Sequence, residues 1–240
     1  MSDLQEVICR DGIPIEKGIV LTKSYLDDNE ELFTKYLNFW ILYPDAFLDA
    51  IQDSTDAINW HLKPFQRIAL RASMRYRYHF WTATRATSKS FTAYLSAFMR
   101  AMLLPRSTIM IASDTKGTVI KIAEAKFEEI FRHWPLLKNE VKTRADDGKT
   151  GIKSSSNYYE LYLKNGSMIS VVSKDTSRGL RATAAILEEA ALIDEIPFNE
   201  VLWPQMNIKR REVDGSLNPE EPSSPQTFIT TAADRTVYMY

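Results

Sequence analysis

The residues with the clearest chemical potential are Lys89 and Ser90, which stand between an apolar run and a stretch of helical periodicity. The run 78–84, YHFWTAT, has the composition of a strand, and the apolar spacing of residues 90–103 predicts a helix. In a phosphate-binding loop, backbone N–H groups and the dipole of such a helix face an anion. We therefore expect Lys89 to reach the β- and γ-phosphates of a nucleotide and the Ser90 hydroxyl to ligate Mg²⁺.

The loop before Lys89 departs from the pattern G-x-x-x-x-G-K-[ST], because Ala83 and Ser88 stand at its two glycine positions. Glycine tolerates positive φ and lets the backbone approach a phosphate. Ser88 must therefore adopt a less favourable conformation or shift the loop. The alternative interpretation is that Thr87 or Ser88 only caps a helix.

Two adjacent acids, Glu188 and Glu189, follow a buried apolar run that begins near residue 183. A nucleotide-hydrolysing site needs one carboxylate to hold Mg²⁺, and many sites add a second to orient the attacking water. Glu188 and Glu189 fit these two roles. The alternative is that both acids begin a surface helix and interact with its dipole.

Two further polar motifs, one before Lys89 and one after the two acids, complete the series of candidate site residues along the chain. Gln66, in the segment LKPFQ, lies before the first strand, and its amide matches the donor and acceptor edge of adenine. Thr230 and Thr231 lie near the end of a further apolar run, 226–233. An amide, a Lys-Ser pair, two acids and two threonines thus follow one another, each beside a predicted strand.

The elements that must position these residues are predicted by apolar periodicity. Residues 107–113 have the pattern of a strand and residues 118–131 that of a helix, which extends a strand–helix alternation typical of a parallel sheet. Residues 158–173 alternate around an Asn-Gly dipeptide at 165–166, which favours a two-residue turn and predicts an inserted β-hairpin. The Pro-, Ser- and acid-rich stretch 211–226 is predicted to be a mobile surface loop.

The first part of the chain has a different character. Residues 29–42 and a stretch beginning at Pro44 have amphipathic helical spacing, with Asp28 placed to cap the first helix. We therefore predict an N-terminal helical segment over 1–60, followed by an α/β domain over 61–240.

Composition excludes several classes of protein. A net charge of -1 and a pI near 6.3 argue against a surface that binds nucleic acid all over. The four arginines within 67–77 are either a local basic patch or a solvated helix face. Cys9 is the only cysteine, and the histidines lack metal-ligand spacing. These histidines are His61, His79 and His133. Because no apolar run approaches roughly 18 residues and nothing marks the N-terminus for secretion, a soluble cytoplasmic protein is expected.

The order of these motifs, with their flanks, resembles the ATPase domain of the large terminase subunit, the DNA-packaging motor of tailed bacteriophages. The resemblance covers most of the chain, and its most specific part is 157–195, a hairpin leading through S-R-G into the acidic strand. LKPFQ at 62–66 resembles the adenine motif of that family, and ITTAADR at 229–235 its coupling motif. YPDAFLDAI at 43–51 resembles the helical lead-in.

This resemblance implies an α/β fold of the P-loop NTPase class, ASCE type, with a mainly parallel central sheet flanked by helices. It implies ATP and Mg²⁺ as ligands, and Arg85 would contact the γ-phosphate in cis. The loop residues that would bind the nucleotide are Arg85, Ala86, Thr87, Ser88, Lys89 and Ser90.

The resemblance also assigns the residues outside the loop. Glu188 would hold the metal and Glu189 would be the catalytic carboxylate, while Gln66 would hold adenine. Thr230 and Thr231 would pass the hydrolysis signal to the parts that grip DNA. An arginine acting in trans from a neighbouring subunit is also implied, and its candidates are Arg144, Arg178 and Arg181.

The expected function is ATP hydrolysis that drives double-stranded DNA into a viral procapsid. The implied partners are DNA, a portal protein, the small terminase subunit and further copies in a ring, within the cytoplasm of an infected host cell and with no membrane. The residues after Thr231 leave no room for the family's C-terminal nuclease, so an isolated ATPase domain is expected. Alternatives are a helicase-like translocase lobe and a non-hydrolysing assembly module with a degenerate loop.

Overall fold

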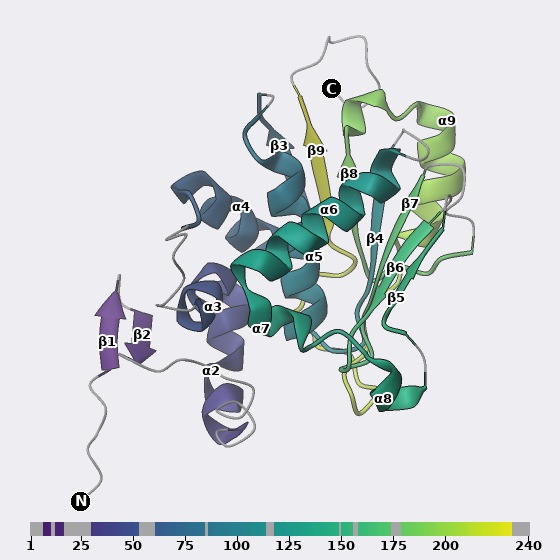
Figure 1. The fold of residues 1–240 in the computed structure, drawn as a ribbon. Coiled ribbons are helices and arrows are strands. Elements are labelled where there is room, and N and C mark those ends of the chain that lie inside the picture. The colour runs from purple at the N-terminus through teal and green to yellow at the C-terminus, as the bar shows by residue number, and fades with distance from the viewer. Residues whose placement is uncertain are drawn as a thin grey trace, which may run out of the picture.

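The computed structural model describes residues 7–10, 13–16, 30–52, 61–84, 86–113, 118–148, 150–155, 158–173 and 179–231. In this part of the chain, one mixed seven-stranded sheet carries helices on both faces (Figure 1). The α/β prediction with a mainly parallel sheet is confirmed.

The sheet has the strand order β3-β9-β8-β4-β7-β6-β5. The first five of these strands run parallel, whereas β6 is antiparallel to both β7 and β5. The strands are β3 (Tyr78–Thr82), β4 (Thr108–Ser113), β5 (Ile152–Ser154), β6 (Tyr158–Tyr162), β7 (Met168–Ser173), β8 (Ala184–Glu188) and β9 (Gln226–Thr230). Strand β9, which comes last in sequence, lies between β3 and β8.

Helices α4, α5 and α6 with the short α7 cover one face of the sheet, and the short turns between residues 190 and 205 cover the other (Figure 1). The longer helices are α2 (Glu30–Leu42), α3 (Pro44–Ile51), α4 (Pro64–Arg75), α5 (Lys89–Leu103) and α6 (Thr118–His133). The short ones are α7 (Pro135–Lys138), α8 (Arg144–Asp147), η1 (Ala190–Leu192), α9 (Glu195–Pro197), η2 (Phe198–Leu202) and α10 (Trp203–Gln205). The predicted helices and strands of the α/β region are confirmed within a few residues at their ends.

Each face of the sheet has its own apolar core. On the α5 and α6 side, Phe98 and Phe127 pack against inward residues of the sheet such as Ile111. On the other side, Phe198 and Leu202 of η2 belong to a second buried cluster. Burial of apolar surface on both faces explains why the central strands are nearly continuous apolar runs.

The predicted hairpin is confirmed as β6 and β7, but its turn is not the expected two-residue type. Only Gly166 has a positive φ, 84°, and the ladder closes through the Leu163 N–H, which donates to the Ser167 carbonyl at 2.9 Å. The Asn165 amide instead donates to the carbonyls of Ala101 and Met102, at the end of α5. The turn is therefore shaped by the helix end above it. Strand β7 also pairs with β4, so the hairpin is part of the central sheet.

The N-terminal segment contains a small antiparallel sheet that periodicity missed. Strands β1 (Val7–Arg10) and β2 (Ile13–Glu16) pair with each other, whereas 1–60 was predicted to be helical. The β-branched run and the Asp-Gly dipeptide between them in the sequence are the overlooked strand signals. The predicted helices are confirmed as α2 and α3, and the boundary at residue 60 stays a prediction.

Helix α3 belongs to the same core as the sheet. Phe47 and Leu48 are buried in the main cluster, and the Trp134 indole donates to the Leu48 carbonyl at 3.1 Å. The buried Asp45 carboxylate accepts two hydrogen bonds from Arg71, at 2.7 and 2.8 Å. Arg67 contacts the same carboxylate. These ion pairs join α3 to α4.

The arginine row of α4 is therefore neither a free basic patch nor a plain solvated face. Besides the pairs of Arg67 and Arg71, Arg75 donates to the Leu42 carbonyl and lies 4.5 Å from the centroid of the Tyr43 ring. Arg77 lies over the ring of Tyr78, 5.1 Å from its centroid. Three of the four arginines therefore join α4 to the N-terminal helices α2 and α3, and Arg77, which follows α4, packs on its neighbour Tyr78.

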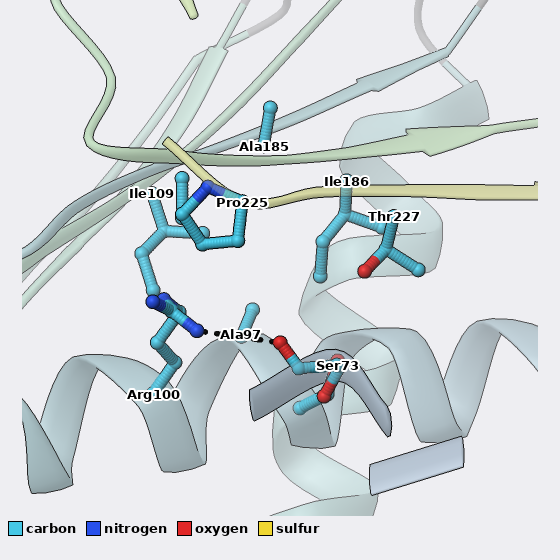
Figure 2. Close-up of a pocket in the computed structure, with 10 residues that line it drawn as sticks. Ser73, Ala97, Arg100, Ile109, Ala185, Ile186, Pro225 and Thr227 are labelled. Carbon is cyan, nitrogen blue, oxygen red and sulfur yellow. Dashed lines mark hydrogen bonds between the residues drawn. The ribbon is translucent and has the colours of Figure 1, made fainter. Parts of the chain in front are cut away.

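The predicted loop 211–226 lacks helix or strand until β9 begins, but ion pairs and hydrogen bonds hold it to the rest of the domain at several points. Arg210 forms ion pairs with Glu212 and Glu221, and Glu221 also contacts the buried Arg100 of α5 at 3.3 Å. Arg100 donates to the Ser73 carbonyl beside a cavity of about 10 Å³, room for about one water (Figure 2). Burial lowers the pKa of Arg100 to about 10.

Candidate nucleotide site

The carboxyl ends of three neighbouring strands meet at one edge of the sheet. In the register, Trp81 of β3 and Glu188 of β8 both pair with Ile229 of β9, so these positions are level with one another. The loop before Lys89 leaves this edge from β3, and the two acids end β8. Lys89 and Glu189 thus lie at the same edge, where ligands of open α/β sheets usually bind.

The glycine-free loop turns by means of left-handed residues. Ala86 has φ 64° and Ser88 has φ 57° and ψ 31°, so Ser88 adopts the less favourable conformation that its place in the pattern requires. Ala83, at the first glycine position, does not have positive φ, and its N–H donates to the Thr230 carbonyl at 3.2 Å. A Cβ is tolerated there because the backbone continues the β3–β9 ladder.

Helix α5 begins at Lys89 without a side-chain cap. The Ser88 side chain makes no capping hydrogen bond, and the Thr87 hydroxyl donates back to the Thr84 carbonyl at 2.8 Å. The alternative in which either residue caps the helix is therefore not observed. Uncapped amides at a helix N-terminus favour an anion.

The Lys89 amine is held at the base of the loop. Its Nζ donates to the carbonyls of Ala83 at 3.0 Å and Thr84 at 2.9 Å. Both acceptors are neutral, and a phosphate oxygen would be a stronger, charged acceptor for the same amine.

The Ser90 hydroxyl and the Glu188 carboxylate meet at this edge. Glu188 is 6% exposed, and burial raises its pKa, as does the adjacent charge of Glu189. Hydrogen bonding from Ser90 opposes this by lowering the pKa of Glu188. A hydroxyl and a carboxylate oxygen are hard ligands of the kind that Mg²⁺ prefers. The pair therefore fits a divalent cation.

Backbone strain is concentrated around this pair. In the described part of the chain, five non-glycine residues have positive φ, and three of them, Ala86, Ser88 and Glu189, lie at this edge. Glu189 has φ 49° and ψ 43°, which turns the chain sharply after β8. Each such conformation costs about 1–2 kcal/mol, and strained residues tend to cluster at functional sites.

Among solved structures, the large terminase of bacteriophage HK97 matches with a TM-score of 0.58 and 14% identity, over 82% of this chain. Over the matched residues, the chain has the fold of a phage large terminase. The ATPase domain of the Thermus phage P74-26 large terminase matches with a TM-score of 0.48 and 17% identity, over 72% of this chain and 66% of that one. No family model matches the sequence, and no curated protein matches it.

The chain spans 39% of the length of the HK97 terminase. Within this terminase fold, the structure brings together Lys89, Ser90, Glu188 and Glu189, with Thr230 beside the loop through its carbonyl. The Thr230 hydroxyl donates to the carbonyl of Thr231 at 3.0 Å.

Gln66 is buried, and part of its amide is already engaged. Its Oε1 accepts the Lys63 N–H at 2.8 Å and closes a capping box at the start of α4. A role in holding adenine would therefore fall to the amide nitrogen, and it stays a prediction.

Neither of the two arginine candidates that the structure describes lies near Lys89. Arg181 precedes β8 and Arg144 begins α8, and both are exposed near the opposite edge of the sheet, where the parallel strands start (Figure 1). A residue that acts on a neighbouring subunit would not lie in its own chain's site, so their trans roles stay predictions. Arg85 and Arg178 lie outside the described residues.

One residue near the acids was missed in the sequence. Tyr94, one helical turn after Ser90, lies near Glu188 and lowers the pKa of its carboxylate. The i, i+4 spacing from Ser90 is the signal that could have found it.

Two classes of feature are absent from the described residues. They contain no group of three histidine, cysteine or acidic side chains placed to hold a metal ion. None of their helices is long and apolar enough to cross a membrane.

Proposed function

We propose that this chain is the ATP-hydrolysing part of a DNA-packaging terminase, which binds ATP with Mg²⁺ and drives double-stranded DNA into a viral procapsid. The observation that supports this most is that Ser90 at the start of α5 and Glu188 at the end of β8 come close together at the same edge as Lys89. A cation-binding hydroxyl and carboxylate beside a lysine at a helix start match the requirements of phosphoryl transfer.

Each residue has a chemical role in this proposal. The loop amides and Lys89 bind the phosphates, and Arg85 adds charge at the γ-phosphate. Ser90 and Glu188 hold Mg²⁺, which when bound neutralises phosphate charge. Glu189 accepts a proton from the attacking water.

The remaining roles concern adenine, the signal and the neighbouring subunits. Gln66 holds adenine, and Thr230 and Thr231 transmit the state of the site, because the loop and β9 share the Ala83–Thr230 hydrogen bond. Arg144, Arg178 or Arg181 acts in trans in a ring of copies. The ring contacts DNA, a portal protein and the small terminase subunit, within the infected cell.

A non-hydrolysing assembly module is the second candidate, and one observation favours it. Ala86 and Ser88 have left-handed conformations although neither is a glycine, and the Lys89 amine donates hydrogen bonds to two carbonyls of the same loop. A loop that had lost its ligand would be free to keep such contacts.

Calorimetric titration with Mg·ATP and a turnover assay distinguish the two. Lys89→Ala should abolish binding and Glu189→Gln should keep binding but lose turnover, while the exposed control Lys164→Ala should retain both. Because an arginine in trans contributes about 10³-fold or more in rate, slow turnover by isolated chains is expected and binding is the decisive readout. A folded wild-type chain that binds no Mg·ATP would instead support the assembly module.

A further inference from the structure

Tyr94 has a polar atom that the apolar core does not explain. Its side chain is 0% exposed, and its hydroxyl oxygen is buried without a hydrogen bond of good geometry in the described part of the chain. Buried polar groups in native proteins nearly always have a partner, so an exception of this kind needs a reason.

The Tyr94 ring is fixed by its neighbours. It packs edge-on against the ring of Phe127 on α6, with 5.4 Å between ring centroids. A side chain held in this way has little freedom to seek another partner, because it lies inside a packed core.

Burial and the nearby charge of Glu188 raise the pKa of Tyr94, so its hydroxyl lies near that carboxylate, and the Ser90 hydroxyl lies near the same acid and lowers its pKa. Tyr94 and Ser90 are one turn apart on α5, so two hydroxyls of one helix lie near the same carboxylate at the end of β8. A carboxylate has two oxygens and about four acceptor sites, and it can therefore take a hydrogen bond and a cation together.

We propose that Tyr94 is a positioning residue for Glu188: its O–H donates to the carboxylate and orients it toward the divalent cation shared with Ser90. This inference rests on the proposed nucleotide site. Groups that orient a metal-binding carboxylate typically contribute 10- to 100-fold to metal affinity. The Tyr94 hydroxyl, which has no hydrogen-bond partner in the described part of the chain, would gain the carboxylate as its acceptor when Glu188 holds the cation.

The rival explanation is that Tyr94 only fills space between α5, α6 and the sheet. A phenylalanine would then serve equally well, because the ring alone contacts Phe127. The chain offers a matched control, since Tyr159 of β6 is 3% exposed and stacks on the same Phe127 at 5.5 Å. The charges that influence the Tyr159 hydroxyl are those of Glu124 and Glu128.

The test compares Tyr94→Phe with Tyr159→Phe. ADP binding is measured by calorimetry with Mg²⁺ and again with EDTA, and Mn²⁺ binding to the ADP complex is followed by electron paramagnetic resonance. Tyr94→Phe should weaken metal binding by about tenfold. It should leave metal-free ADP affinity unchanged, and Tyr159→Phe should alter neither.

Each other outcome has a defined meaning. Equal metal affinity in both variants would overturn the role of Tyr94 while leaving the nucleotide site intact. If the wild-type chain gains nothing from Mg²⁺, the proposed function itself fails. Should Tyr94→Phe lower the melting temperature, a cycle with Glu188→Gln decides: adding Tyr94→Phe to that variant should cost no further metal affinity, and a full additional loss would contradict the proposal.

Discussion

The Ser90 hydroxyl at the start of α5 lies close enough to the Glu188 carboxylate at the end of β8 to lower the pKa of that acid. The two residues are far apart in the sequence, and β9 aligns the strands that lead to them, because it lies between β3 and β8. Strand β9 pairs with both β3 and β8, and the loop after β3 is bonded to its last residue, Thr230. A shift of β9 would therefore move the loop relative to the acid.

The strained loop gives a stability prediction. Ser88→Gly should stabilise the folded chain by about 1 kcal/mol, because glycine adopts a φ of 57° without the Cβ penalty. Thr87→Gly, one residue earlier and without positive φ, should destabilise the folded chain. The variant loses the hydrogen bond to the Thr84 carbonyl, and glycine raises the conformational entropy of the unfolded chain. Urea unfolding of both variants checks this, and a destabilised Ser88→Gly would show that the left-handed turn is not present in solution.

The contact between α3 and α4 gives a second prediction. Asp45→Asn should destabilise the chain by about 2 kcal/mol, because a fully buried carboxylate pairs with two arginines that remain about a third exposed. Asp49→Asn is the matched control. Asp49 is 29% exposed, and its loss should cost under about 1 kcal/mol. Equal costs in denaturant unfolding would mean that the Asp45 ion pairs do not join the two helices.

His79 on β3 predicts a dependence of stability on pH. Burial lowers the pKa of His79 below its ordinary 6.5, and its Nδ1 has no hydrogen-bond partner in the described part of the chain. Well above pH 6.5 the histidine is neutral in both folded and unfolded states. As the pH falls below 6.5 the unfolded state takes up the proton first, so folding free energy is lost between 6.5 and the lower folded pKa.

Replacing His79 removes this contribution. From about pH 7 to 5, the unfolding free energy of His79→Gln should fall less steeply than that of the wild type. The two slopes should differ by at most the amount that corresponds to the uptake of one proton on unfolding. His61→Gln, at an exposed position, is the control. Identical slopes for His79→Gln and the wild type would contradict a neutral, buried imidazole.

The sequence predicts the elements of this fold better than their arrangement. Strong apolar periodicity locates α5, α6 and the central strands, because burial on one or both faces sets that pattern. Strand order is different: β9 comes to lie between β3 and β8 through contacts that no local pattern contains. The hairpin β1–β2 was missed because four-residue strands carry little periodic signal.

The site shows the same division. Residue type and order identify Lys89, Ser90 and the two acids, since their chemistry is local and their places follow predicted strands. The left-handed backbone of Ser88 was only one of two possibilities, because no glycine marks it. The hydroxyl of Tyr94 was missed because a tyrosine in an apolar helix is indistinguishable by pattern from a core residue. Its significance depends on Glu188, which tertiary structure alone brings near.

The most direct test of the account is a crystal structure with Mg²⁺ and a non-hydrolysable ATP analogue. We predict a metal ion about 2.1 Å from the Ser90 Oγ, beside Glu188, with the phosphates enclosed by the loop 83–88 and contacted by Lys89. A nucleotide bound elsewhere on the chain, or a metal ion remote from both Ser90 and Glu188, would contradict it.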